Sequence, residues 1–148
     1  MSELAYNKRA TFDYELLDHY EAGLVLSGQE VKSAKTGHIS LRGAFVTRKG
    51  GEFYLTNANI PFYVHAGENK NYDPTRPRKL LLRKAEIKKL VGKMAIEGLT
   101  LVPIRVYTKK RLLKLEFAVG KGKKQYDKRS SIAKREAQRK AERALKSY

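Results

Sequence analysis

The stretch LVPIRVYTKKRLLKLEFAVG, residues 101–120, decides the fold class of this chain. Apolar side chains recur at every second position on both sides of a basic sequence, which is the period of a strand with one buried face. We therefore predict two strands joined by a solvated turn at Lys109-Lys110-Arg111. Pro103 cannot donate a hydrogen bond, so it predicts an edge or a bulge in the first strand. The positions expected to share a buried face are Val102, Ile104 and Val106 in the first strand and Leu113, Leu115, Phe117 and Val119 in the second.

Further strands are predicted upstream of this pair. Residues 11–16 alternate polar and apolar side chains, the pattern of a half-buried strand, and apolar content continues at residues 24–26. Residues 44–56 have the pattern of a hairpin whose turn is Gly50-Gly51, because both glycines tolerate a positive φ. The apolar members of the first alternating segment are Phe12, Tyr14 and Leu16.

One amphipathic helix is predicted around residues 87–94, where apolar residues fall at i, i+3, i+4 and i+7 and Gly98 supplies a stop. A shorter helical turn is expected at residues 31–35, and an irregular loop at residues 69–77. Several short strands with one packed helix indicate a mainly β fold, namely an antiparallel oligonucleotide-binding (OB)-like β-barrel with one amphipathic and one short helix. The apolar helix residues are Ile87, Leu90, Val91 and Met94.

The charge of the chain restricts its partners. Its 148 residues include 32 Lys and Arg against 15 Asp and Glu, which gives a formal net charge of +17. Such a surplus fits nucleic acid, an anionic membrane surface or an acidic protein. Nucleic acid is favoured, because Lys and Arg release the counterions that condense on phosphates. A solvated basic surface without a partner is the remaining alternative.

The basic residues concentrate at the end of the chain. Residues 121–148 hold 11 Lys and Arg against 3 Asp and Glu, a net +8, and few large apolar side chains. We therefore predict an RNA-binding barrel over residues 1–120 and a basic C-terminal tail over residues 121–148. Spaced alanines and favourable i,i+4 ion pairs allow a helix there, but an alanine face buries little area. We expect the tail to be disordered alone and helical when bound to an anionic partner.

Patterns for catalysis or cofactor binding are weak. The three histidines show no metal-ligand spacing, the carboxylates form no paired motif, and GKGKK at residues 120–124 lacks the spacing of a phosphate loop. The sequence has no cysteine, which excludes thiolate metal sites and fits a reducing compartment. It also has no apolar run of the roughly 20 residues that a membrane span needs, and no secretory signal. We expect a soluble, cytoplasmic protein that is not an enzyme and has neither a cofactor nor a membrane partner.

Four blocks of sequence occur in a recognisable order. They are NKRA at 7–10 with DY at 13–14, EAGLVL at 21–26 with GQEVKS at 28–33, RPRKLLL at 76–82 with EI at 86–87, and GKKQYDKR at 122–129. Each block is moderately specific alone, and all four in this order and spacing are highly specific. Together they resemble the small protein B (SmpB) family, the SsrA-binding proteins that partner transfer-messenger RNA (tmRNA), over nearly the whole chain.

The resemblance implies an OB-like barrel and a role in trans-translation. A member of this family binds the tRNA-like domain of tmRNA and helps deliver alanyl-tmRNA to stalled ribosomes. Its tail then occupies the empty decoding site and mRNA channel, which allows ribosome rescue and tagging of the nascent chain. The implied partners are tmRNA and the ribosome (the 16S rRNA decoding centre and mRNA channel), with elongation factor Tu carrying alanyl-tmRNA as a further candidate. We expect a monomer.

The same resemblance assigns expected site residues, most of which can meet a phosphate or a base edge. Tyr126 lies among cations, which suits base stacking beside neutralised phosphates, and Asp127 is expected to cap the tail helix. The expected tmRNA-binding residues are Asn7, Lys8, Arg9, Glu21, Lys32, Arg78, Lys79, Leu81, Lys121, Lys123 and Lys124. The residues expected in the decoding site are Tyr126, Asp127, Lys128, Arg129, Leu145 and Lys146.

Two other functions stay open at this point. A structural ribosomal protein, or another rRNA-binding protein, would also be small and basic with an extension. A nuclease or other phosphoryl-transfer enzyme is the third candidate. The scattered carboxylates and histidines argue against that enzyme, because metal-assisted hydrolysis needs clustered ligands.

Overall fold

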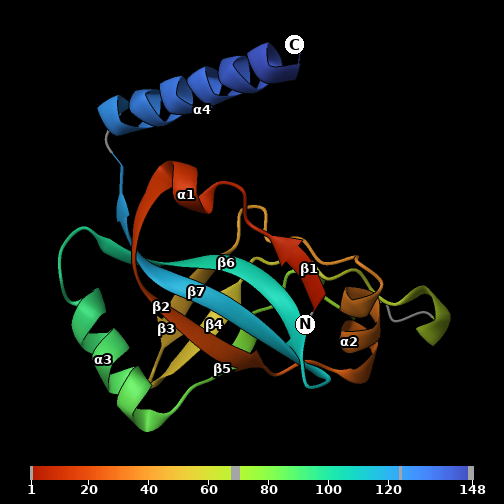
Figure 1. Cartoon of the computed structure of the whole chain (residues 1–148). Coiled ribbons are helices and arrows are strands. Elements are labelled where there is room, and N and C mark those ends of the chain that lie inside the picture. Colours follow the sequence, from red (N-terminus) through yellow and green to blue (C-terminus); the bar gives the residue numbers. More distant parts are fainter. Residues whose placement is uncertain (1, 68–70, 124, 147–148) are drawn as a thin grey trace.

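The computed structural model describes residues 2–67, 71–123 and 125–146. Within these residues, seven strands form one antiparallel sheet in the order β1-β6-β7-β2-β5-β4-β3. The sheet curls so that β3 approaches β6, and the strands form an OB-like barrel around the core (Figure 1). The elements in chain order are β1 (Ser2–Tyr6), α1 (Ala10–Asp13), β2 (Tyr14–Leu24), α2 (Gly28–Lys35), β3 (Phe45–Lys49), β4 (Glu52–Thr56), the 3-10 turn η1 (Val64–Ala66), β5 (Arg78–Leu81), α3 (Lys84–Met94), β6 (Leu99–Lys109), β7 (Leu112–Gly122) and α4 (Gln125–Lys146).

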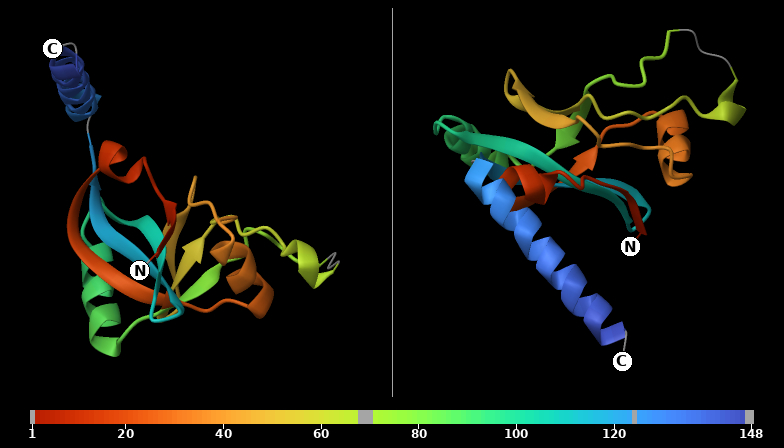
Figure 2. Two further views of the ribbon diagram at one scale, coloured as in Figure 1. Left: turned by 45° about the vertical axis from the view of Figure 1, so that its right-hand side comes forward. Right: turned by 90° about the horizontal axis from the view of Figure 1, so that it is seen from above.

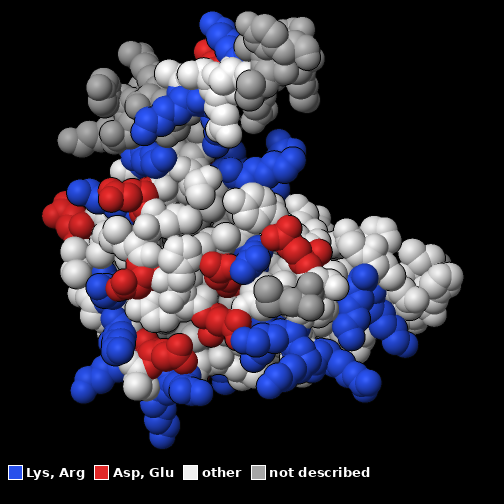
Figure 3. All heavy atoms as spheres, viewed as in Figure 1, with Lys and Arg blue, Asp and Glu red and all other residues white. Residues whose placement is uncertain are grey.

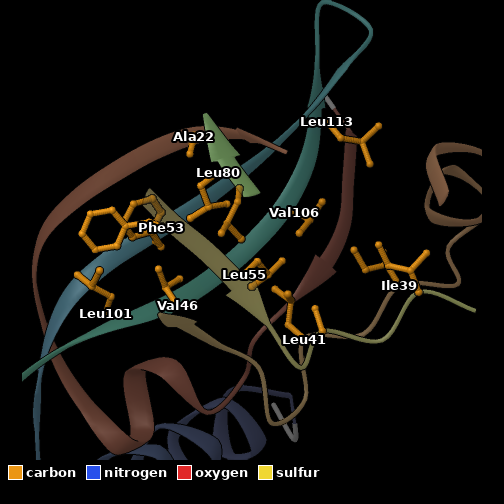
Figure 4. Close-up of a cluster of buried hydrophobic side chains, with 14 of the residues drawn as sticks. Ala22, Ile39, Leu41, Val46, Phe53, Leu55, Leu80, Leu101, Val106 and Leu113 are labelled. Atoms are coloured by element: carbon orange, nitrogen blue, oxygen red, sulfur yellow. The ribbon is translucent and has the colours of Figure 1, made fainter. Parts of the chain in front are cut away.

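A main core of aliphatic and aromatic side chains fills the space between the curled strands. Phe53 and Leu55 of β4 and Leu80 of β5 are fully buried, and their side chains point toward those of the long strands β6 and β7 (Figure 4). The inward positions predicted for β7 are confirmed, because Leu113, Leu115, Phe117 and Val119 all belong to this core.

The prediction for β6 was wrong in one respect. Its three alternating apolar residues do not share a face, because the register shifts between Pro103 and Arg105. Only Val106 reaches the main core, whereas Val102 and Ile104 face a smaller cluster with Ala10 and Ala118. The bulge predicted from Pro103 is confirmed, since one extra residue in a strand reverses the facing of those beyond it.

Residues 10–13 also differ from expectation. Phe12 lies in the short helix α1 rather than in a strand, and β2 begins only at Tyr14. The chain turns here because α1 covers the smaller cluster, against which Tyr14 and Leu16 also pack. The alternation of these last two residues was therefore a true strand signal, whereas Phe12 was not part of it.

The two predicted helices and both hairpin turns are confirmed. Helix α3 packs its predicted apolar residues against the main core. Helix α2 begins three residues earlier than predicted, because Ser27 and Glu30 form a capping box at its start. The hairpin of β3 and β4 turns at Gly50-Gly51, and that of β6 and β7 turns at Lys110-Arg111. Of the loop predicted at residues 69–77, residues 71–77 form neither helix nor strand, and residues 69 and 70 lie outside the described residues.

The C-terminal segment forms one helix beyond the barrel. Strand β7 continues to Gly122 and α4 begins at Gln125, so the change in structure falls a few residues after Gly120. Figure 2 shows α4 leaving the barrel past α1. The described side chains of α4, at 132–141 and 143, are all exposed. The flexibility expected of the tail in the free protein stays a prediction. Among the described residues, no helix is long and apolar enough to span a membrane.

Candidate nucleic-acid interface

A groove crosses three neighbouring strands at one end of the barrel. It is formed where β7, β2 and β5 lie side by side, and Gly23 of β2 pairs with Leu81 on one side and Lys114 on the other. A Cβ at Gly23 would lie 3.4 Å from the side chain of Leu81, so Leu81 lies directly against the backbone of Gly23. The residues lining the groove are Glu21, Gly23, Glu52, Lys79, Leu80, Leu81, Leu82, Arg83, Glu86 and Lys114.

Glu21 is held as a carboxylate at the edge of this groove. The Tyr107 hydroxyl donates a hydrogen bond to it, and Lys109 Nζ lies 3.4 Å from Glu21 Oε1. The hydrogen bond from Tyr107 and the charges of Lys109 and Lys114 lower the pKa of Glu21, against the opposing effect of burial. Burial and the adjacent Glu21 carboxylate raise the pKa of Tyr107, which keeps its hydroxyl protonated as a donor. Glu21 therefore presents a charged acceptor to the groove.

The other predicted groove residues offer complementary contacts. Lys79 is exposed, and its Nζ lies 3.7 Å from Glu52 Oε1, a loose pair that leaves the ammonium accessible. Leu81 is 57% exposed, an unusual position for a leucine in a strand. An acceptor, an apolar side chain and cations within one groove are the groups that meet base edges, sugars and phosphates.

Lys114 lines the groove but was not among the predicted site residues. Its signal was present in β7, where Lys114 and Glu116 occupy the polar positions between the inward Leu113, Leu115 and Phe117. The alternation that predicts the inward face of this strand also places Lys114 on its outward face. Pairing with Gly23 places Lys114 in the groove, beside Glu21.

Arg78 was expected on the tmRNA-binding surface, and the structure corrects this prediction. It is fully buried, and its guanidinium donates to Glu30 Oε2 at 2.9 Å, the Ala58 carbonyl at 2.6 Å and the Pro74 carbonyl at 2.9 Å. Burial raises the pKa of Glu30, but hydrogen bonds from Arg76, the Ser27 amide and Arg78 outweigh it and lower the pKa to about 2. Arg78 thus neutralises a buried carboxylate and cannot contact RNA from this position.

The N-terminal residues lie apart from the groove. Asn7 donates from Nδ2 to the Pro103 carbonyl at 2.8 Å and accepts from the Arg9 amide, so its side chain fixes the entry to α1 beside the β6 bulge. Arg9 pairs with Asp13 at 3.2 Å and stacks on Phe12, while Lys8 is exposed. In Figure 1, α1 is at the opposite end of the barrel from the turn of β6 and β7. The structure therefore does not bring residues 7–9 to Glu21, Lys79 and Leu81.

The remaining expected residues are dispersed. Lys32 of α2 holds its ammonium 6.0 Å from the Tyr63 ring, and Lys121 is exposed on β7. Lys123 donates from Nζ to the Thr11 carbonyl at 2.8 Å. Lys124 lies outside the described residues. The side chains of Tyr126, Asp127, Lys128, Arg129, Leu145 and Lys146 on α4 also lie outside the described part of the structure.

The charged surface agrees with an anionic ligand at this end of the barrel. Basic side chains gather along the edge of the molecule that holds α3 and the turn of β6 and β7, with acidic side chains among them (Figure 3). Among the residues that the structure describes, no group of three or more His, Cys, Asp and Glu could hold a metal ion.

Comparison with known proteins gives one consistent family. The sequence model described as "SmpB protein" matches residues 4–147. The chain is 47% identical over 143 residues to an SsrA-binding protein of Chloroflexus aggregans, covering 97% of this chain and 90% of the relative. It is 50% identical over 141 residues to an SsrA-binding protein of Salinispora arenicola, covering 95% and 88%. A solved structure described as "tmRNA-SmpB: a journey to the center of the bacterial ribosome" matches with a TM-score of 0.66 and 45% identity, over 81% of this chain and 84% of that one.

Proposed function

Because the chain belongs to the SmpB family, we propose that it binds the tRNA-like domain of tmRNA and supports trans-translation on stalled ribosomes. The observation that carries this proposal is the groove in which Glu21, Leu81 and Lys114 meet. This groove combines an ionised acceptor, an exposed apolar side chain and cations on rigid strands.

Each group has a distinct task in the proposed complex. The Glu21 carboxylate accepts from a base amino group or a ribose hydroxyl, since it is ionised and oriented by Tyr107. Lys79 and Lys114 neutralise phosphates, which positions the RNA without reading its sequence. Leu81 packs on the apolar face of a sugar or an unstacked base. A folded RNA with exposed loops suits such a site better than a regular duplex.

The tail performs the second task. Residues 121–148 carry a net +8 on 28 residues, and α4 has no described side chain buried against the barrel. Such a basic segment can bind rRNA phosphates in the decoding centre and the mRNA channel without first breaking a packed contact with the barrel. The barrel would thus hold tmRNA while the tail binds in the mRNA channel, which is open to it only when mRNA is absent. Alanyl-tmRNA, delivered with elongation factor Tu, would then enter only stalled ribosomes.

In this role the protein is a non-catalytic adaptor that works where ribosomes are, in the cytoplasm. The family is one of RNA-binding factors, and the groove offers recognition groups rather than a nucleophile with its base. The peptidyl-transfer chemistry belongs to the ribosome, and the protein contributes binding and placement.

Sequencing of the RNA that copurifies with the protein tests this proposal. From a lysate that contains tmRNA and ribosomes, we expect tmRNA to be enriched over tRNA and over free rRNA, and the protein to be present on a minority of ribosomes. A structural ribosomal protein would instead be found in equal amount with ribosomal subunits and show no tmRNA enrichment. That second result would refute the adaptor function.

A further inference from the structure

The turn between β6 and β7 holds two consecutive residues in a conformation that L-amino acids rarely adopt. Lys109 pairs with Leu112, so the loop has two residues, Lys110 and Arg111, with φ of 51° and 68°. Positive φ at both positions is the geometry of a type I′ turn, which Asn-Gly, Asp-Gly and Gly-Gly normally form. Residues with a Cβ are strained there.

The other two-residue hairpin turn of the chain has glycines at both turn positions, so its backbone is not strained. Lys49 pairs with Glu52, and Gly50-Gly51 forms the turn with a φ of 62° at Gly50. A hairpin of this length therefore does not require a strained pair in this protein. Glycine would relieve the backbone strain at Lys110 and Arg111. The chain keeps the strained residues instead, which points to a function of their side chains.

The strained turn presents its cations beside the groove. Lys109, Lys110 and Arg111 are all exposed, and Lys109 Nζ lies 3.4 Å from Oε1 of the groove residue Glu21. Basic side chains gather at the edge of the molecule where this turn lies (Figure 3). The turn thus lies beside the Glu21 end of the groove, and its cations add to Lys79, Arg83 and Lys114, which line the groove.

We propose that the β6–β7 turn, residues 109–111, is a phosphate-binding finger that extends the groove along the RNA backbone. A tight turn holds successive cations on a rigid hairpin, so less conformational entropy is lost on binding than from a mobile loop. The inference rests on the proposed RNA-binding function. Phosphate is the ligand chemistry, and the tRNA-like domain of tmRNA or ribosomal RNA is its source.

The test separates backbone strain from charge. In the full chain, the double variant Lys110→Asn/Arg111→Gly supplies a preferred turn and removes two cations. We expect its Tm to rise by roughly 3–6 °C. Its Kd for the labelled tRNA-like domain should be roughly tenfold weaker at ~0.1 M salt, with a logarithmic salt slope shallower by about 1.5. A protein that becomes more stable while it binds less well is the signature of strain retained for function.

Two controls accompany this variant. The double variant Lys110→Gln/Arg111→Gln keeps the strained backbone and should lose the same affinity with a Tm within about 1 °C of the parent. The double variant Lys134→Gln/Lys140→Gln removes two exposed cations from α4, away from the groove, and should change the Kd for the tRNA-like domain by less than about twofold.

Binding to the purified small ribosomal subunit, measured with the same variants, identifies the source of the phosphates. A loss confined to the subunit would support the finger with rRNA as its ligand. Unchanged binding of both RNAs by the Lys110→Asn/Arg111→Gly variant would overturn the inference while the proposed function stands. A parent that binds neither RNA would overturn the proposed function and the inference together.

Discussion

Arg78 and Lys79 are neighbours in a basic run, yet one is buried and the other faces solvent. Both belong to β5, in which exposure alternates, so Arg78 and Leu80 point to the core while Lys79 and Leu81 point outward. Strand alternation alone could have separated them, but four residues of strand flanked by prolines and cations give a weak period. The family resemblance and the charge suggested RNA as the partner of both residues, whereas the structure buries Arg78 and pairs it with Glu30.

The ionised Glu30 gives the barrel a pH dependence. Folding lowers its pKa from 4.5 to about 2, so the folded protein binds this proton less readily than the unfolded chain does. The stabilisation is therefore complete above about pH 4.5 and is lost as the pH falls through 2. At 1.36 kcal/mol for each pKa unit, the difference is about 3 kcal/mol.

We predict that Glu30→Gln lowers the free energy of unfolding by about 3–5 kcal/mol at pH 7, because the buried Arg78 loses its counter-charge. The parent should also lose more stability than the variant between pH 4.5 and pH 2.5. Urea unfolding followed by circular dichroism measures both effects. The exposed Glu97→Gln serves as the control and should stay within about 0.5 kcal/mol of the parent. An equally small change for Glu30→Gln at pH 7 would contradict the ion-pair account.

At the scale of elements, local patterns were sufficient where one face of one element decides its position. The α3 stripe, the inward face of β7 and the Gly50-Gly51 turn are of this kind. The pattern failed in β6, where the bulge between Pro103 and Arg105 moves Val102 and Ile104 to a second cluster. The sequence indicates that a bulge is present but not which residues lie beyond it, because that depends on the partner strands.

Helix α4 is the element whose role is most separable from the barrel. Its described side chains are exposed, and Arg135 contacts the barrel by stacking on Phe12 at 5.6 Å. Asp127 falls in the first turn of α4, and its side chain lies outside the described part of the structure. The capping expected of Asp127 stays a prediction.

We predict that changing Asp127, Lys128 and Arg129 together to Ala leaves the affinity for the isolated tRNA-like domain within about twofold, because these residues lie beyond the barrel. The variant should fail to tag stalled chains in a cell-free translation reaction, since the tail could no longer order on rRNA. Normal tagging, or loss of binding to the tRNA-like domain, would contradict this division of labour between barrel and tail.

At the scale of the whole molecule, composition and strand patterns predicted the class of partner and the fold class, but they did not predict the topology of the sheet. A net charge of +17 indicated a nucleic-acid partner, and strand patterns indicated a small barrel. The strand order, with β1 on β6 and β5 between β2 and β4, was beyond reach. Those pairings join segments far apart in the chain, and single-strand patterns do not specify their partners. The groove depends on them, because it exists only where β7, β2 and β5 lie side by side.

The central claim is that this groove holds tmRNA, and equilibrium binding of the labelled tRNA-like domain over a range of salt tests it most directly. The double variant Lys79→Ala/Lys114→Ala should bind roughly tenfold more weakly at ~0.1 M salt than the parent, with a logarithmic salt slope shallower by about 1.5. Its circular dichroism and Tm should match the parent, since both side chains are outside the core. The control Lys134→Gln/Lys140→Gln on α4 should bind as the parent does. A groove variant with the affinity and the salt slope of the parent would contradict the claim.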